Sequence, residues 1–199
     1  MALISNFESR APVSWASDAV IGNVTIGLES PADFWARERL LDDAFGVSRF
    51  DKTVERLRAG RKPAGGLAFA AKDSHGLIGT LRLWHIMAGG VPALLLGPLA
   101  VAKVFRGQGI GRALMEEALG KAAKAGHKAV LLVGDPAYYE PFGFSRRHTL
   151  GLTLPGPVAE SRFLGLELAQ DALKGARGLV AGAVDLSARH CAIMFRRAA

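Results

Sequence analysis

The feature that most constrains this chain is the stretch 93–112, in which an apolar run passes through a glycine-rich turn into a helix pattern. Apolar residues fill 93–96 and, after Gly97-Pro98, 99–101. The turn 106–111 reads Arg-Gly-Gln-Gly-Ile-Gly. A buried strand that runs through glycines into a helix gathers backbone N–H groups at the positive end of the helix dipole. This stretch therefore predicts a site for a phosphate-bearing small molecule.

The segment after the turn predicts one parallel strand pair. Apolar residues recur at helical spacing from Ile110 until Gly126, and 128–133 is an apolar run typical of a buried strand. A strand, a helix and a strand in this order form a right-handed unit in which the two strands are parallel. Upstream, 67–71 and 77–87 read as strands that join 93–101 in an antiparallel meander.

The two ends of the chain give weaker patterns. A strand is expected at 24–28, a helix from Ser30-Pro31 to Gly46, and a second short helix at 50–59. Near the C-terminus, 163–168 reads as a strand, 175–182 as a loop, and 183–195 as a last strand or short helix.

The predicted fold class is α/β (α+β), a mixed and mainly antiparallel sheet of about six to seven strands flanked by about four helices, with one parallel βαβ junction. The chain has 199 residues, enough for one sizeable core. We expect an N-terminal extension at 1–22 and a single domain at 23–199.

Composition excludes several classes of protein. The net charge of +7 suits an anionic ligand, but the basic residues are scattered and do not alternate with aromatics, which disfavours a nucleic-acid-binding surface. The single cysteine, Cys191, excludes an internal disulfide framework. Without an apolar run of about 18–20 residues or a signal-peptide pattern, we expect a cytoplasmic protein that does not enter membranes.

Two well-known phosphate-binding turns do not match. A P-loop needs Gly, four residues and Gly-Lys-Ser/Thr, and the chain has no such run. A dinucleotide turn needs Gly-x-Gly-x-x-Gly, but counting from Gly107 or Gly109 puts Arg112 or Leu114 at the third glycine. What fits is Arg-x-x-Gly-x-Gly, from Arg106 to Gly111, after a strand that ends in Leu-Ala-Val.

This pattern resembles the GCN5-related N-acetyltransferase (GNAT) superfamily, whose signature is Arg/Gln-x-x-Gly-x-Gly/Ala. A second landmark of that family, Tyr-x-x-x-Gly-Phe, matches Tyr-Glu-Pro-Phe-Gly-Phe at 139–144. The stretches Leu-Gly-Pro-Leu-Ala-Val at 96–101 and Gly-Asp-Pro-Ala-Tyr-Tyr at 134–139 are similar to its YhbS-like group. The resemblance implies an enzyme whose cosubstrate is acetyl-coenzyme A (acetyl-CoA), with no metal.

The resemblance also implies which residues contact the cosubstrate. The strand residues Leu99, Ala100 and Val101 would pair with the pantetheine arm, and a backbone N–H of this strand would hold the oxyanion. Backbone amides of the turn would hold the pyrophosphate, with Arg106 and Arg112 adding positive charge. The turn residues are Arg106, Gly107, Gln108, Gly109, Ile110, Gly111 and Arg112. Asp135 stands where relatives often have an asparagine that contacts pantetheine, and an ionised carboxylate cannot donate that hydrogen bond.

The resemblance assigns the general acid to Tyr139, whose hydroxyl would protonate the departing thiolate of coenzyme A. Tyr138 is its neighbour and the alternative, and either ring could serve only for packing. The general base is harder to identify, because the strand 93–101 carries no Asp or Glu. His85 is the tentative base and Glu167 a second candidate, although a structural role is the more common one for such residues. The pair His190-Cys191 makes a poor zinc site without further ligands.

The predicted reaction is direct attack of a primary amine on the acetyl thioester within a ternary complex. The alternative is a non-catalytic module that binds acyl-CoA as a sensor, and a nucleic-acid-associated protein is a third hypothesis. The acceptor is expected to be a small-molecule or peptide amine. Its identity, the length of the acyl group, a homodimeric state and the role of the two ends of the chain are open on the sequence alone.

Overall fold

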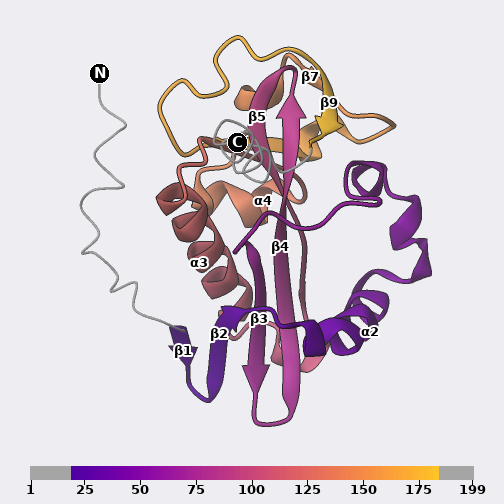
Figure 1. The fold of residues 1–199 in the computed structure, drawn as a ribbon, viewed down its shortest axis with the longest axis vertical. Coiled ribbons are helices and arrows are strands. Elements are labelled where there is room, and N and C mark those ends of the chain that lie inside the picture. Colours follow the sequence, from indigo (N-terminus) through magenta and orange to yellow (C-terminus); the bar gives the residue numbers. More distant parts are fainter. Residues whose placement is uncertain (1–18, 184–199) are drawn as a thin grey trace, which may run out of the picture.

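The computed structural model describes residues 19–183, which form a long twisted sheet with helices on both faces (Figure 1). The strand order is β1-β2-β3-β4-β5-β6-β8, and β9 pairs with β4 and β7. The strands are β1 (Ala19–Ile21), β2 (Val24–Leu28), β3 (Ala68–Asp73), β4 (Gly76–Ala88), β5 (Val91–Val101), β6 (Ala129–Val133), β7 (Leu152–Thr153), β8 (Phe163–Glu167) and β9 (Gly178–Gly182).

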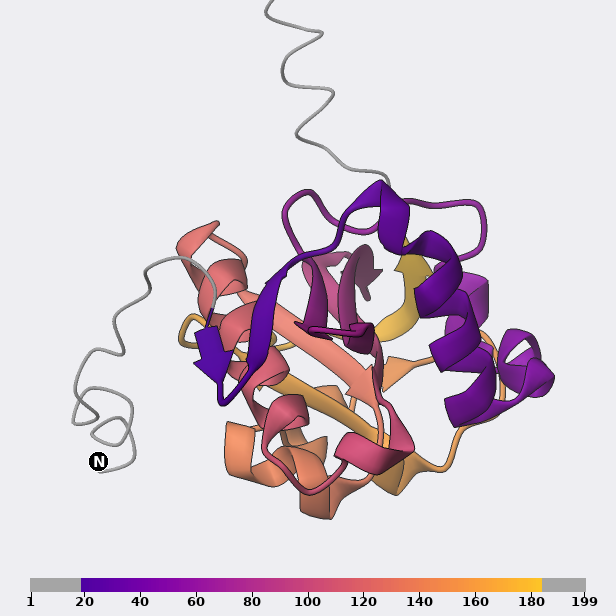
Figure 2. The same ribbon diagram turned by 90° about the horizontal axis from the view of Figure 1, so that it is seen from below.

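The two long helices pack on opposite faces of the sheet (Figure 2). Helix α3 (Ile110–Lys124) packs with Leu99 and Val101 of β5, whereas α2 (Phe34–Phe45) packs with Ala100. The short helices are η1 (Pro31–Asp33), η2 (Val47–Asp51), η3 (Thr53–Leu57), η4 (Lys103–Phe105), α4 (Pro136–Tyr139), η5 (Glu140–Phe142), η6 (Arg146–Thr149) and η7 (Glu160–Arg162). No helix within residues 19–183 is long and apolar enough to cross a membrane.

The predicted meander and junction are confirmed. Strands β3, β4 and β5 are antiparallel neighbours, and β5, α3 and β6 form the parallel unit. Apart from the β5–β6 and β7–β9 pairs, the paired strands of the described residues are antiparallel. The predicted fold class, a mixed and mainly antiparallel sheet, is therefore correct.

The structure differs from the expectations at the ends of the chain. The loop predicted at 175–182 is wrong, because β9 forms there by pairing with the end of β4, a contact distant in sequence. The helix expected at 50–59 is instead the two 3-10 segments η2 and η3. Strand β1 lies within the expected extension 1–22 and pairs with β2. Residues 184–195 of the expected last element, and the pair His190-Cys191, lie outside the described residues.

A series of ion pairs connects α2 to the sheet. Glu29, just after β2, accepts a hydrogen bond from Arg82 Nε of β4 at 2.7 Å and pairs with Arg37 of α2. Arg37 also pairs with Glu38 at 2.7 Å, and Glu38 pairs with Arg49 of η2. The side chains of Glu29 and Arg37 are only 6% and 4% exposed. The segment that follows α2 is thus held by charge as well as by packing.

We predict that Glu29→Ala lowers the free energy of unfolding by about 3–5 kcal/mol, because it leaves two cations without their shared buried carboxylate. Urea unfolding followed by circular dichroism measures the change. Lys174→Ala is the matched control, since its pair with Asp171 is exposed and such pairs contribute about 0–1 kcal/mol. Equal stability of the two variants would contradict the prediction.

Candidate functional site

The site is organised by the divergence of two parallel strands. Strands β5 and β6 pair at only two positions, Leu94 with Val130 and Leu95 with Leu131. Continuing this register puts Gly97 level with Val133 and Pro98 level with Gly134, where the two strands no longer pair. A gap in the hydrogen bonding of the sheet therefore begins at Gly97.

A bulge in β5 marks the same point. The register between β4 and β5 shifts so that Leu81 faces Leu99 but Leu83 faces Leu96, leaving Gly97-Pro98 opposite a single residue of β4. The Gly97 carbonyl accepts a hydrogen bond from the indole N–H of buried Trp84 at 2.6 Å. The backbone at the bulge is thus fixed from one face of the sheet.

Past the bulge, β5 presents an open backbone edge. Ala102 N donates to Ile78 O at 2.8 Å, and the alternation of an antiparallel ladder then turns the N–H and C=O groups of Leu99 and Val101 away from β4. Arg106 Nε donates to the Val101 carbonyl at 3.0 Å, consistent with that direction. The backbone groups of Ala100 turn toward β4. Of the three strand residues predicted to contact a ligand, Leu99 and Val101 have the orientation to pair with one.

The predicted glycine turn directly follows this edge. Gly107 and Gly109 have φ values of +81° and +84°, a left-handed conformation that favours glycine, and Gly109 caps α3. Among the described residues, the N–H groups of 107–112 have no backbone acceptor. Ile110 is buried at the start of α3 and anchors the turn to the core. The result is a row of unpaired donors at a helix N-terminus, which is suited to an anion.

Side chains around the turn add charge and aromatic surface. Arg112 is half exposed, pairs with Glu116 at 3.2 Å and lies over the Phe142 ring at 5.5 Å from its centroid. A methyl group at Gly111 would come within 2.6 Å of the Tyr138 hydroxyl, so that hydroxyl sits at the first turn of α3. Burial raises the pKa of Tyr138, with Arg112 opposing the shift. The Tyr138 hydroxyl therefore lies beside the glycine turn, although the residue itself is on α4.

Tyr139 lies at the divergence of the strands instead. The Asp135 carboxylate accepts a hydrogen bond from Ala137 N at 3.2 Å and so caps α4, which carries both tyrosines. The Tyr139 ring lies against Gly134, where a methyl group would overlap it, and packs edge-on to Phe144. Burial raises the pKa of Tyr139 to about 12. At neutral pH its hydroxyl is therefore a hydrogen-bond donor beside the level of Pro98.

The two base candidates lie elsewhere. His85 pairs in register with Leu94, and its ring lies 5.4 Å from that of His127, beyond the C-terminal end of α3. Helix α3 has 15 residues, so the glycine turn at its other end is roughly 22 Å away. Glu167 accepts a hydrogen bond from Leu173 N at 2.8 Å. The structure does not bring either residue beside Tyr139, and the described residues contain no cluster of three or more His, Cys, Asp or Glu that could hold a metal.

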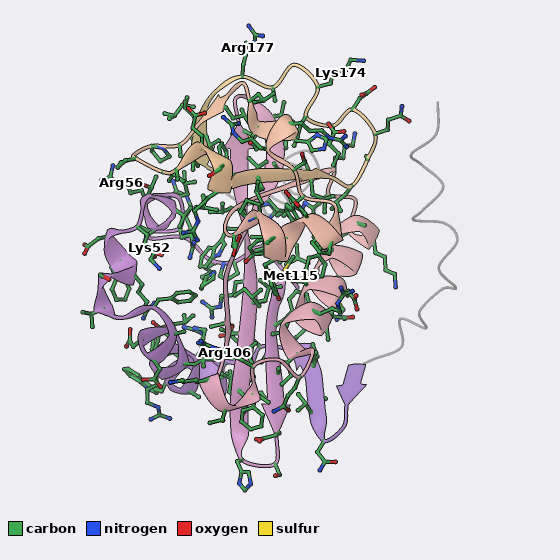
Figure 3. The ribbon with its side chains drawn as sticks, turned by 180° about the vertical axis from the view of Figure 1, so that it is seen from behind. Lys52, Arg56, Arg106, Met115, Lys174 and Arg177 are labelled. Atoms are coloured by element: carbon green, nitrogen blue, oxygen red, sulfur yellow. The ribbon has the colours of Figure 1, made fainter. Side chains whose placement is uncertain are left out.

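Sequence reasoning missed a group of cations on the other side of the bulge. Arg58 Nη2 lies 3.9 Å from the position of a Cβ on Gly97. The Arg162 carbonyl accepts a hydrogen bond from Gly134 N at 2.9 Å. Lys52 lies between η2 and η3, in the segment shown in Figure 3. In the sequence these three residues look like solvent-facing charges, and no local pattern distinguishes them.

Comparison with known proteins gives consistent matches. The family model of the acetyltransferase (GNAT) domain matches residues 64–146. A protein of Escherichia coli strain K12, described as the uncharacterized N-acetyltransferase YhbS, is 36% identical over 159 residues. That match covers 78% of this chain and 93% of the relative.

Solved structures agree with the sequence matches. The structure of the E. coli GNAT family N-acetyltransferase YhbS in complex with CoA has a TM-score of 0.71 and 33% identity, covering 84% of this chain and 93% of that one. A GNAT family acetyltransferase from Brucella melitensis, in complex with acetyl-CoA, has a TM-score of 0.61 and 25% identity, covering 80% and 96%. Both likenesses extend well beyond the glycine turn.

The burial of Tyr139 predicts an unusual alkaline titration. The chain has two tyrosines, so tyrosinate absorbance should rise in two phases, the later one near pH 12 and absent in Tyr139→Phe. Because the folded pKa is raised above the unfolded value of about 10, this tyrosine stabilises the fold fully below pH 10, and the stabilisation is lost as pH rises through 12. Circular dichroism over the same range reports whether the fold persists. A single phase near pH 10 in the folded protein would contradict the burial of Tyr139.

Proposed function

We propose, from the premise that the chain belongs to the GNAT acetyltransferase family, that it transfers the acetyl group of acetyl-CoA to a primary amine by direct attack in a ternary complex. The observation that carries the proposal is the continuity of three parts: the unpaired amides of 107–112, the open edge of β5, and the Tyr139 hydroxyl at the strand divergence.

The pyrophosphate, the pantetheine arm and the thioester of acetyl-CoA would meet these three parts in that order. The amides of the turn would hold the pyrophosphate, with Arg106 and Arg112 nearby, and the edge at Leu99 and Val101 would pair with the pantetheine arm as an added strand. From Val101 to Gly97 the strand runs roughly 13 Å. The thioester would therefore reach the bulge at Gly97-Pro98, beside Tyr139. The complexes of the E. coli and Brucella relatives with CoA and acetyl-CoA support this assignment.

The proposed chemistry uses Tyr139 as general acid. The neutral amine attacks the thioester carbonyl, and the tetrahedral oxyanion accepts a hydrogen bond from an N–H of the open strand edge. As the C–S bond breaks, the Tyr139 hydroxyl donates its proton to the sulfur, and the proton lost by the attacking nitrogen replaces it. The raised pKa of Tyr139 keeps that donor protonated. The scheme uses neither His85 nor a metal, and Asp135 acts by capping α4.

We predict that Tyr139→Phe lowers kcat by about 10²–10⁴-fold, the usual contribution of a positioned acid, with the KM for acetyl-CoA nearly unchanged. A CoA-release assay across amines, amino acids, polyamines and peptide N-termini measures the effect. Tyr138→Phe is the matched control and should keep its kcat, because that hydroxyl lies at the glycine turn. A fully active Tyr139→Phe enzyme would refute the acid assignment alone. CoA binding without release to any acceptor would favour the non-catalytic sensor.

We predict that Gly109→Ala weakens CoA binding at least tenfold, because a side chain at this φ rearranges the row of amides. Gly126→Ala is a closely matched control: Gly126 has φ +83° and an equally open surrounding at the other end of α3. Both variants should lose about 1–2 kcal/mol of stability. Isothermal titration calorimetry with CoA then distinguishes the two variants. Equal affinities for CoA would contradict the proposal that the amides of 107–112 bind the pyrophosphate.

A further inference from the structure

The cationic residues near Gly97 form one group, which we call the cation cluster: Arg58, Lys52 and Arg162. Arg58 follows η3, and its side chain is 11% exposed, with Nη2 lying near Gly97. Its Nε is buried and has no hydrogen-bond partner among the described residues. Burial lowers the pKa of Arg58 to about 10. An orphaned, buried donor of a charged group normally has a partner in the working protein.

Contacts between distant segments join the part of the chain that carries Lys52 and Arg58 to the part that carries Arg162. Thr53 Oγ1 of η3 donates to the Pro157 carbonyl at 2.8 Å, and Arg56 Nη1 donates to the Pro155 carbonyl at 2.7 Å. These bonds tie η3 to the segment that leads into η7, where Arg162 lies. Figure 3 shows Lys52 and Arg56 on the same segment, across the sheet from Met115 of α3. Burial, followed by the charges of Arg58 and Arg162, lowers the pKa of Lys52.

The charge of the cluster is poorly compensated within the described residues. Arg49 is also nearby, but Glu38 and Asp42 pair with it. Glu55 forms an ion pair with Arg58 Nη1 at 3.6 Å, and Lys52 Nζ lies 4.4 Å from the centroid of the Phe45 ring. No carboxylate of residues 19–183 pairs with Lys52 or Arg162, so one anion faces three cations. The Arg58 side chain is nearly buried, whereas Lys52 and Arg162 are exposed. Their like charges repel one another, and an anion from outside relieves that repulsion.

We propose that the acceptor is a small amino acid-like amine, whose carboxylate is bound by Arg58, Lys52 and Arg162 while its amine faces the thioester at Gly97. This inference rests on the proposed function, since it places the acceptor at that reaction centre. The 3.9 Å between Arg58 Nη2 and the Gly97 position keeps amine and carboxylate within one small molecule. The Nη2 group of Arg58, which lies nearest Gly97, is a charged donor suited to a carboxylate oxygen. Polyamines would meet the cluster with like charge.

The test compares matched acceptors in the CoA-release assay with saturating acetyl-CoA. Free amino acids and their amides differ only in the carboxylate, and the free acids should have kcat/KM at least tenfold higher. Aminoalkyl phosphates form a third series. Higher activity with amides, polyamines or aminoalkyl phosphates than with free amino acids would overturn the carboxylate assignment.

Charge-neutralising variants locate the effect. Lys52→Gln and Arg162→Gln should each raise the KM for the amino acid by about 10-fold or more, the equivalent of one charge-assisted hydrogen bond, with kcat and the KM for acetyl-CoA nearly constant. Both positions are exposed, so the variants should fold. Lys174→Gln makes the same charge change on an exposed loop outside the cluster and should have no effect. Unchanged amino acid KM values in both cluster variants would overturn the proposal.

A binding measurement separates this inference from the proposed function. N-acetyl amino acids and their amides are titrated calorimetrically into the CoA-loaded protein. Preferential binding of the acids, reduced at least tenfold in Lys52→Gln and Arg162→Gln, supports the cluster even where no CoA is released, and then the transferase proposal alone fails. If the amides bind as tightly as the acids, the proposal that the cation cluster binds a carboxylate is overturned, whatever rate of CoA release is measured.

Discussion

The parallel contact between β5 and β6 is short, and the two strands separate after two paired positions. Backbone N–H and C=O groups inside a sheet normally pair with a neighbouring strand, and an unpaired edge is a place where another chain or ligand can add. Because β6 separates from β5 after Leu95, no strand pairs with the backbone N–H and C=O groups of Leu99 and Val101. Helix α3 begins shortly after these residues. A single topological feature thus places an open strand edge next to a helix N-terminus.

The two faces of the sheet contribute different parts to this place. Helix α3 and the Tyr139 ring lie on one face, and the Trp84 indole and Arg58 approach Gly97 from the other. In the proposed reaction, the cosubstrate and the acceptor would approach the bulge from these two faces, because a ternary complex needs both reactants bound at once.

The series of ion pairs around α2 connects the β4 residue at the bulge to η2, the segment just before Lys52 of the cation cluster. Arg82 is the β4 residue opposite Gly97-Pro98, and it connects through Glu29 and Arg37 to Glu38 and then to Arg49. Arg49 lies shortly before Lys52 in the chain. A buried network of this kind has few alternative arrangements, because each unpaired charge would carry a desolvation penalty. The position of η2 and η3 relative to the reaction centre is therefore tied to the sheet itself.

The central part of the fold and the conformation of the glycine turn can be predicted from local patterns in the sequence. Helical spacing from Ile110, the apolar run of β6 and the glycines at 107–111 are local signals, and backbone amides that bind an anion need only the right conformation. Tyr139 could be selected as the candidate acid because it lies in a contiguous motif downstream of the glycines. Local patterns failed where pairing is distant: β9 has no periodicity of its own and exists because the end of β4 accepts it.

Which side chains meet where β5 and β6 separate follows from long-range packing and has no local signal in the sequence. The tertiary structure places His85 beside His127 beyond the far end of α3, although the sequence makes His85 the best imidazole candidate. It brings Arg58, Lys52 and Arg162 together from segments about a hundred residues apart, where the sequence shows only scattered charges. The physical reason is that a backbone site is encoded by local conformation, whereas a side-chain cluster is encoded by long-range packing and the balance of charge.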